Sequence, residues 1–190
     1  MGATLSAPPL LLFAALVGCA PMHADVRAKS FPARRPGIAG RFDVGPSSPN
    51  STYLLLRLAE RRLYMVTYDR QSGTETEIES FPVAIGRREY ETPTGLFRVN
   101  EKIVDPDWVQ FDWKDPSRVI RTIPPGPDNP LGRRWIGFAS GYGWQIGFHG
   151  TPHPELLGQA VSHGCVRMRN DDVVKVYDRV AVGTVVLVQP

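Results

Sequence analysis

Cysteine is nearly absent from this chain of 190 residues, in which Cys19 and Cys165 are the only two. Cys19 closes an apolar stretch near the N-terminus, and removal of that stretch would leave one thiol and no possible internal disulfide. An unpaired thiol in an exported protein oxidises readily, so its presence favours a chemical role. Apolar neighbours would favour a buried, inert cysteine instead, but Cys165 is flanked by His163, Gly164 and Arg167.

Long hydrophobic runs are also missing. The apolar run at residues 10–17 (LLLFAALV) is too short to span a bilayer and is typical of the central region of an export signal. Residues 16–19 (LVGC) resemble a bacterial lipobox, in which Cys19 would be lipidated and tether the protein to the membrane. No Lys or Arg precedes the run, so cleavage after Ala24 by the ordinary signal peptidase is the alternative. We predict an export signal at residues 1–24 and a location in the bacterial cell envelope (periplasm).

A strong charge of one sign is absent too. The net charge is +3, from 22 basic and 19 acidic residues, and the basic residues are scattered. No run alternates basic with aromatic residues, so we expect no nucleic-acid partner. The mild basicity fits a solvated surface or work beside an anionic cell wall.

The folded part is expected at residues 51–190, after a flexible linker rich in Pro, Gly, Ser and Arg at residues 25–50. Eighteen prolines and eighteen glycines favour turns and short strands over long helices. An apolar stripe predicts a helix over residues 173–180, with Asn170 as its N-cap. Residues 105–130 show little periodicity and predict a long lid-like loop, whose tryptophans either line a substrate groove or pack beneath the loop. Strands are expected at residues 52–58 and 62–68 (a hairpin), 77–85 (with Pro82 marking an edge or bulge), 95–103, 134–139, 144–149 and 185–188. The fold class is therefore mainly β, with one or two short helices.

The chemistry is concentrated in residues 149–170 (HGTPHPELLGQAVSHGCVRMRN), which hold three of the four histidines. Cys165 lies one glycine from His163 and sixteen positions after His149. A thiol is a strong nucleophile only as the thiolate, and a nearby imidazole is the usual means of forming one near neutral pH. Gly164 permits a sharp turn, and its amide and that of Cys165 are candidate donors to a developing oxyanion. The stretch predicts a cysteine acyl-transfer site, and its spacing leaves both histidines open as the base.

Two neighbouring polar residues have candidate roles. If the backbone is extended, Arg167 projects on the same side as Cys165, where its guanidinium would bind a substrate carboxylate and favour the thiolate. Ser162 either hydrogen-bonds an imidazole or caps a turn.

A zinc site is the competing interpretation, since His149, His153, His163 and Cys165 are all potential ligands. Prolines on both sides of His153 exclude a helical i, i+4 pair, and no recognised ligand spacing is present. We therefore expect His153 to be a loop residue and the site to hold no metal.

Two segments, His149-Gly150-Thr151 and residues 162–168 (SHGCVRM), resemble the signature of the L,D-transpeptidase (YkuD-type) catalytic domain. Residues 92–99 (TPTGLFRV), 124–132 (PPGPDNPLG) and 134–137 (RWIG) are also similar to segments of this family. The resemblance extends from about Tyr53 to the C-terminus.

This resemblance implies a YkuD-type β-sandwich that cross-links peptidoglycan stem peptides. Cys165 would attack the third residue of a donor stem, and the side-chain amine of a second stem would resolve the thioester as a 3→3 cross-link. This implied reaction needs no metal, nucleotide or organic cofactor. His149 would be the base, oriented by the carbonyl of Gly150 or a neighbour, and His163 would shape the oxyanion site. Substrate binding and oxyanion stabilisation would involve Gly150, Ser162, Gly164 and Arg167, although many family members carry Asn at the position of Arg167.

Other acceptors and other classes stay open. Water as acceptor would make the protein an L,D-carboxypeptidase, and an amine of an envelope protein would make it an attachment enzyme. A hydrolytic thiol peptidase and a non-catalytic wall-binding module with an inert Cys165 are the remaining alternatives.

Overall fold

The computed structural model describes residues 17–18, 50–69, 71–112, 114–115, 117–139 and 145–190. The predicted export signal and linker lie outside these residues, except for Val17, Gly18 and Asn50, so their boundaries stay a prediction. The two-residue strand β1 (Val17–Gly18) pairs in parallel with β8 (Trp108–Phe111).

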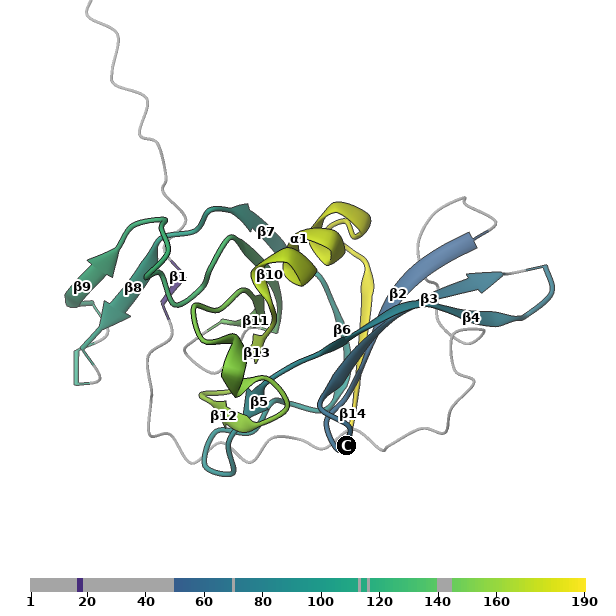
Figure 1. Cartoon of the computed structure of the whole chain (residues 1–190), viewed down its shortest axis with the longest axis horizontal. Helices are drawn as coiled ribbons and strands as arrows, with labels where there is room; N and C mark the ends of the chain where they lie inside the picture. The colour runs from purple at the N-terminus through teal and green to yellow at the C-terminus, as the bar shows by residue number, and fades with distance from the viewer. Residues whose placement is uncertain (1–16, 19–49, 70, 113, 116, 140–144) are drawn as a thin grey trace, which may run out of the picture.

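A five-stranded sheet forms one side of the fold, in the spatial order β4-β3-β2-β14-β6 (Figure 1). The predicted first hairpin is confirmed: β2 and β3 pair antiparallel, with Arg57 opposite Arg62 at the turn. The proline-containing strand β4 lies at the sheet edge, as Pro82 indicated. The strands are β2 (Asn50–Arg57), β3 (Arg62–Asp69), β4 (Glu75–Pro82), β6 (Gly95–Arg98) and β14 (Val185–Gln189).

A four-stranded sheet carries the motif-bearing strands, in the order β13-β11-β10-β7. Its strands are β7 (Glu101–Val104), β10 (Arg134–Ala139), β11 (Ile146–His149) and β13 (Val166–Arg167). The helix α1 (Asn170–Arg179) contacts β10 and β11. Two shorter pieces, β5 (Ile85–Gly86) and β12 (Ala160–Ser162), pair in parallel, and the 3₁₀ helix η2 spans Pro154–Leu156.

The main core lies between the two larger sheets and α1. Because side chains alternate along a strand, Leu54 and Leu56 of β2 point to this core, while Tyr53 and Leu55 join a smaller cluster on the other face. The four-stranded sheet contributes Ile136 and Phe148, and α1 contributes Val173 and Val176, all fully buried. The mainly β class predicted from the sequence is confirmed.

Three predicted boundaries are wrong. The strand expected at residues 77–85 ends at Pro82, and Ile85 belongs to β5 in another sheet, because Ala84 pairs with Arg167 instead of continuing the ladder with β3. The single strand expected at residues 95–103 is two strands in different sheets, because the chain turns at Val99 and Asn100: the Val99 amide bonds to Thr184, and the Asn100 amide to Gly137. The loop expected at residues 105–130 contains a hairpin of β8 (Trp108–Phe111) and β9 (Val119–Ile123). Both strands are short, so neither shows a clear two-residue period.

The predicted N-cap is also wrong. Asn170 is the first residue of α1 rather than its cap, the cap position is Arg169, and no side chain caps the helix. The Asn170 amide is used in tertiary contacts instead.

In the described part of the chain, no helix has the length and hydropathy needed to cross a membrane.

The packing predicts a clear difference between two leucines of the five-stranded sheet. Leu56→Ala should lower the free energy of unfolding by about 2–5 kcal/mol, because it opens a cavity in the main core. Leu96 on β6 is 40% exposed, so Leu96→Ala should cost less than about 1 kcal/mol. Urea unfolding of both variants measures the difference, and equal losses would contradict this location of the core.

Candidate active site

The strand register of the four-stranded sheet brings the two motif segments together. β11 lies between β10 and β13, with Trp135 opposite His149 on one side and Arg167 opposite His149 on the other. Cys165 directly precedes β13. Residues sixteen positions apart in sequence therefore meet at one end of the sheet.

These segments border a cavity of about 400 Å³. The β8–β9 hairpin forms the opposite wall, so the predicted lid-like region does lie at the site. Trp108 both lines the cavity and packs against the buried cluster of Leu131, Trp135 and Cys165, which combines the two roles considered for the loop tryptophans. Trp113 lies outside the described residues. The lining residues are Trp108, Gln110, Phe111, Ile120, Pro130, Leu131, His149, Ser162, His163, Cys165 and Arg167.

The imidazole of His149 is buried and held from two directions. Its Nδ1 lies 2.6 Å from the Gly150 carbonyl oxygen, which only accepts hydrogen bonds, so Nδ1 carries the proton. The indole of Trp135 stacks on it, with ring centroids 6.0 Å apart and planes inclined by 25°. In the neutral ring, Nε2 is then the nitrogen that accepts a proton.

The surroundings keep this ring neutral. Burial, and to a smaller extent the positive charge of Arg167, lower the pKa of His149, while hydrogen bonds to the carbonyls of Gly150 and Pro130 act in the opposite direction; the net result is a pKa of about 4. The imidazole of His149 is therefore uncharged at neutral pH.

Cys165 is buried at the end of a glycine turn, and its thiol donates to the Gln145 carbonyl at 3.7 Å. Gly164 has φ +103°, a conformation that side chains rarely adopt. The Thr92 hydroxyl donates to the Gly164 carbonyl and accepts from the Gly86 amide, both at 2.9 Å. Thr92 thus fixes the turn that presents the sulfur.

Ser162 caps this turn, which is one of its two predicted roles. Its buried hydroxyl donates to the Cys165 carbonyl at 2.5 Å and accepts from the Gly164 amide at 3.2 Å. The Gly164 amide is therefore directed at Ser162, and the expectation that it points to an oxyanion is wrong for this structure. The amide of Cys165 stays a predicted oxyanion donor.

The other two histidines of the motif differ in position. His163 lines the cavity but is exposed, and its ring lies 4.9 Å from that of Tyr90. Desolvation, Arg87 and Arg167 lower the pKa of His163. His153 precedes η2 in an exposed loop, with Nδ1 3.1 Å from Glu155 Oε1, as expected of a loop residue.

Among the residues that the structure describes, no three His, Cys, Asp or Glu side chains gather as a metal-binding group. Arg167 is half-buried, lies on an extended strand and faces the same cavity as Cys165, as the spacing predicted.

Three residues that contact His149, Cys165 or the turn before Cys165 had no role predicted from the sequence. Thr92 and Trp135 belong to family-like segments, so their positions were visible in the sequence, although their contacts were not. Nothing in the sequence marks Gln145, which acts through its backbone carbonyl.

Comparisons with known proteins agree with this arrangement. The family model described as the L,D-transpeptidase catalytic domain (YkuD) matches residues 51–188. "Putative L,D-transpeptidase YqjB" of Bacillus subtilis is 35% identical over 142 residues, which cover 74% of this chain and 72% of that protein. "Probable L,D-transpeptidase ErfK/SrfK" of Salmonella typhimurium is 35% identical over 138 residues, 69% of this chain but only 42% of the relative.

The fold has solved counterparts as well. L,D-transpeptidase 3 of Mycobacterium tuberculosis superimposes with a TM-score of 0.56 at 20% identity, covering 74% of this chain and 62% of that one. An L,D-transpeptidase of Mycobacterium smegmatis gives a TM-score of 0.53 at 19% identity, covering 74% and 59%.

A buried thiol and a neutral imidazole at one cavity define a cysteine-dependent acyltransferase. Within that class, the chain belongs to the L,D-transpeptidase family, because the family model matches most of its length.

The neutral state of His149 predicts a pH dependence of stability. Between about pH 4 and 6.5 the unfolded chain binds a proton at His149 that the folded chain excludes. The free energy of unfolding should therefore fall as the pH is lowered through this window, by up to about 1.4 kcal/mol per pH unit from this residue. His149→Gln cannot titrate and should show a flatter profile in urea unfolding from pH 4.5 to 7.5. Parallel profiles would contradict a depressed pKa.

Proposed function

We propose that this protein is a peptidoglycan L,D-transpeptidase that forms 3→3 cross-links through a thioester on Cys165. The observation that carries the proposal is the shared cavity, in which a buried thiol lies with a neutral imidazole whose Nδ1 donates to Gly150. The names of the relatives at 35% identity support the same activity.

The first half-reaction uses the thiol and the base. His149 Nε2 takes the thiol proton, and Cys165 Sγ attacks the carbonyl carbon of the third residue of a donor tetrapeptide stem, a meso-diaminopimelate L-centre. The amide nitrogen of the terminal D-alanine receives the proton from His149 as the C–N bond breaks, so D-alanine leaves and a thioester remains. A positioned base of this kind typically accelerates proton transfer by 10²–10⁴-fold.

The second half-reaction reverses these roles. The side-chain amine of an acceptor stem attacks the thioester carbonyl and loses a proton to His149. The C–S bond breaks, Cys165 recovers a proton, and the new amide joins the two stems. The Cys165 amide and His163 would stabilise the oxyanion in both steps. No bound metal or organic cofactor takes part in this scheme.

Arg167 is the proposed contact for a substrate carboxylate. Its guanidinium faces the cavity beside the thiol, and stem peptides carry carboxylates that a planar guanidinium binds in a bidentate manner. The aromatic wall of Trp108 and Phe111 would cover the uncharged part of the stem.

The cellular setting follows from the substrate. We propose that residues 1–24 direct export, that the enzyme acts in the bacterial cell envelope, and that residues 25–50 link the catalytic domain to its leader. Lipidation at Cys19 would add a membrane tether, and cleavage after Ala24 would give a soluble envelope protein.

Product analysis tests the reaction and separates the acceptors. Purified tetrapeptide muropeptides incubated with the enzyme should yield dimers joined 3→3, identified by mass spectrometry. Cys165→Ala should form none, and a folded His149→Ala should lose at least about 100-fold in rate.

Other products would redirect the assignment. Tripeptides without dimers would indicate an L,D-carboxypeptidase, and products formed only with an added protein amine would indicate an attachment enzyme. An intact substrate together with an iodoacetamide-unreactive Cys165 would indicate a wall-binding module.

The carboxylate contact makes a separate prediction. Arg167→Ala should raise KM for the donor stem about tenfold or more and lower kcat less, because a carboxylate contact contributes mainly to ground-state binding. Arg133→Ala removes an exposed guanidinium away from the cavity lining and is the matched control. An unchanged KM in Arg167→Ala would mean that Arg167 does not contact the donor.

A further inference from the structure

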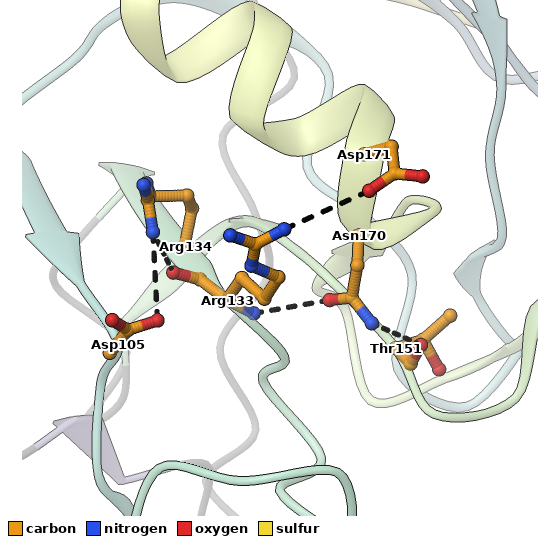
Figure 2. A network of polar contacts seen from close by, with 6 residues as sticks. All are labelled: Asp105, Arg133, Arg134, Thr151, Asn170 and Asp171. Atoms are coloured by element: carbon orange, nitrogen blue, oxygen red, sulfur yellow. Dashed lines mark hydrogen bonds and ion pairs between the residues drawn. The ribbon is translucent and has the colours of Figure 1, made fainter.

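The side chain of Asn170 joins three segments around the candidate site. From the first turn of α1, its Oδ1 accepts the Arg133 amide and its Nδ2 donates to the Thr151 carbonyl, each at 3.1 Å (Figure 2). Arg133 directly precedes β10, and Thr151 follows the His149-Gly150 end of β11. One amide group therefore connects two backbone segments that are not otherwise adjacent in sequence.

The two segments are shaped to receive this amide. A Cβ added at Gly132 would lie 2.1 Å from Asn170 Oδ1, and one added at Gly150 would lie 2.0 Å from it. Gly132 also has φ +63°, a left-handed conformation. Both glycines therefore leave the space that the Asn170 amide fills.

These segments also supply the carbonyls that surround the imidazole of His149. The Gly150 carbonyl accepts from Nδ1 at 2.6 Å, and the Pro130 carbonyl, three residues before Arg133, also acts on the ring. Asn170 bonds to Thr151, one residue after Gly150, and to Arg133, three residues after Pro130. A shift of either segment would therefore move a carbonyl that orients the base.

The Arg133 side of the bridge is itself anchored. The Arg133 carbonyl accepts from the Asp105 amide at 3.0 Å. It also accepts from Arg134 Nη1 at 2.7 Å, and the same Nη1 lies 3.6 Å from Asp105 Oδ1 (Figure 2). Asp105, which directly follows β7, thus holds the carbonyl of the same residue whose amide bonds to Asn170, so Arg133 is fixed on both sides.

We propose that Asn170 is a positioning residue, which holds the imidazole of His149 in line with the Cys165 thiol through the backbone of Gly150 and Thr151. The proposal rests on the proposed role of His149 as base. Proton transfer depends strongly on alignment, and a displacement of about 1 Å can cost on the order of 100-fold in rate. Loss of the bridge would also let water reach the buried ring.

Asn170→Ala tests the proposal with a readout other than turnover. With ¹³C-labelled histidine, the Cε1–Hε1 signal of His149, assigned by its disappearance in His149→Ala, should titrate with a pKa raised from about 4 toward 6.5. The single-turnover acylation rate should fall about 10- to 100-fold, with a smaller change in KM. Asp171→Asn is the matched control, because it alters the same helix turn and removes only the exposed 3.8 Å contact with Arg133. It should leave both measurements unchanged.

A second variant keeps the proposal testable if Asn170→Ala does not fold. Asn170→Asp keeps an acceptor for the Arg133 amide but, when ionised, cannot donate to Thr151, so it should show a smaller shift in the same direction. The proposal is overturned if the folded variants titrate and acylate like the wild type. A fully active His149→Ala would instead refute the assignment of the base, while the titration of His149 would still report whether Asn170 orients the ring.

Discussion

The pairing of β11 with β13 is the interaction on which the site depends. It is only two residues long, with Phe148 opposite Val166 and His149 opposite Arg167. Short parallel pairs are weak by themselves, so neighbouring contacts support this one. The Met168 amide donates to the His149 carbonyl at 2.8 Å, and Ala84 and Arg167 exchange two backbone hydrogen bonds of 3.0 and 2.8 Å. Backbone hydrogen bonds therefore help to bring the segment of Cys165 to His149.

Burial and charge at this junction act on the two reacting groups in opposite ways. Desolvation and the Arg167 guanidinium both oppose the imidazolium, which keeps His149 neutral. We propose that the same guanidinium favours a thiolate at Cys165, because a nearby cation stabilises an anion. Proton transfer from the thiol to the imidazole therefore forms a disfavoured imidazolium and a favoured thiolate, and the two effects partly cancel. A substrate carboxylate bound to Arg167 would offset its positive charge and so weaken its effect on both His149 and Cys165. Substrate binding would then change the protonation of these two groups.

Local sequence patterns correctly predicted the strands and the helix that are specified by residues close together in the sequence. The β2–β3 hairpin follows from two apolar runs around a short turn, and α1 follows from valines at helical spacing. Patterns failed where a partner distant in sequence decides the outcome. Residues 95–103 divide at Val99 because two adjacent amides bond to different parts of the chain, the Val99 amide to Thr184 and the Asn100 amide to Gly137. Asn170 looks like a helix cap, but tertiary contacts at Arg133 and Thr151 take its side chain.

The sequence by itself determined the chemical inventory: one thiol beyond the leader, histidines near it, a glycine before the sulfur and a family signature around them. It also determined the mainly β character, because strand and turn preferences are local. Only the tertiary structure decided how His149 and His163 differ. The first is buried against Trp135 with its Nδ1 on Gly150, while the second lies exposed beside Tyr90. Desolvation and alignment depend on groups packed from distant parts of the chain, and spacing within one motif does not contain that information.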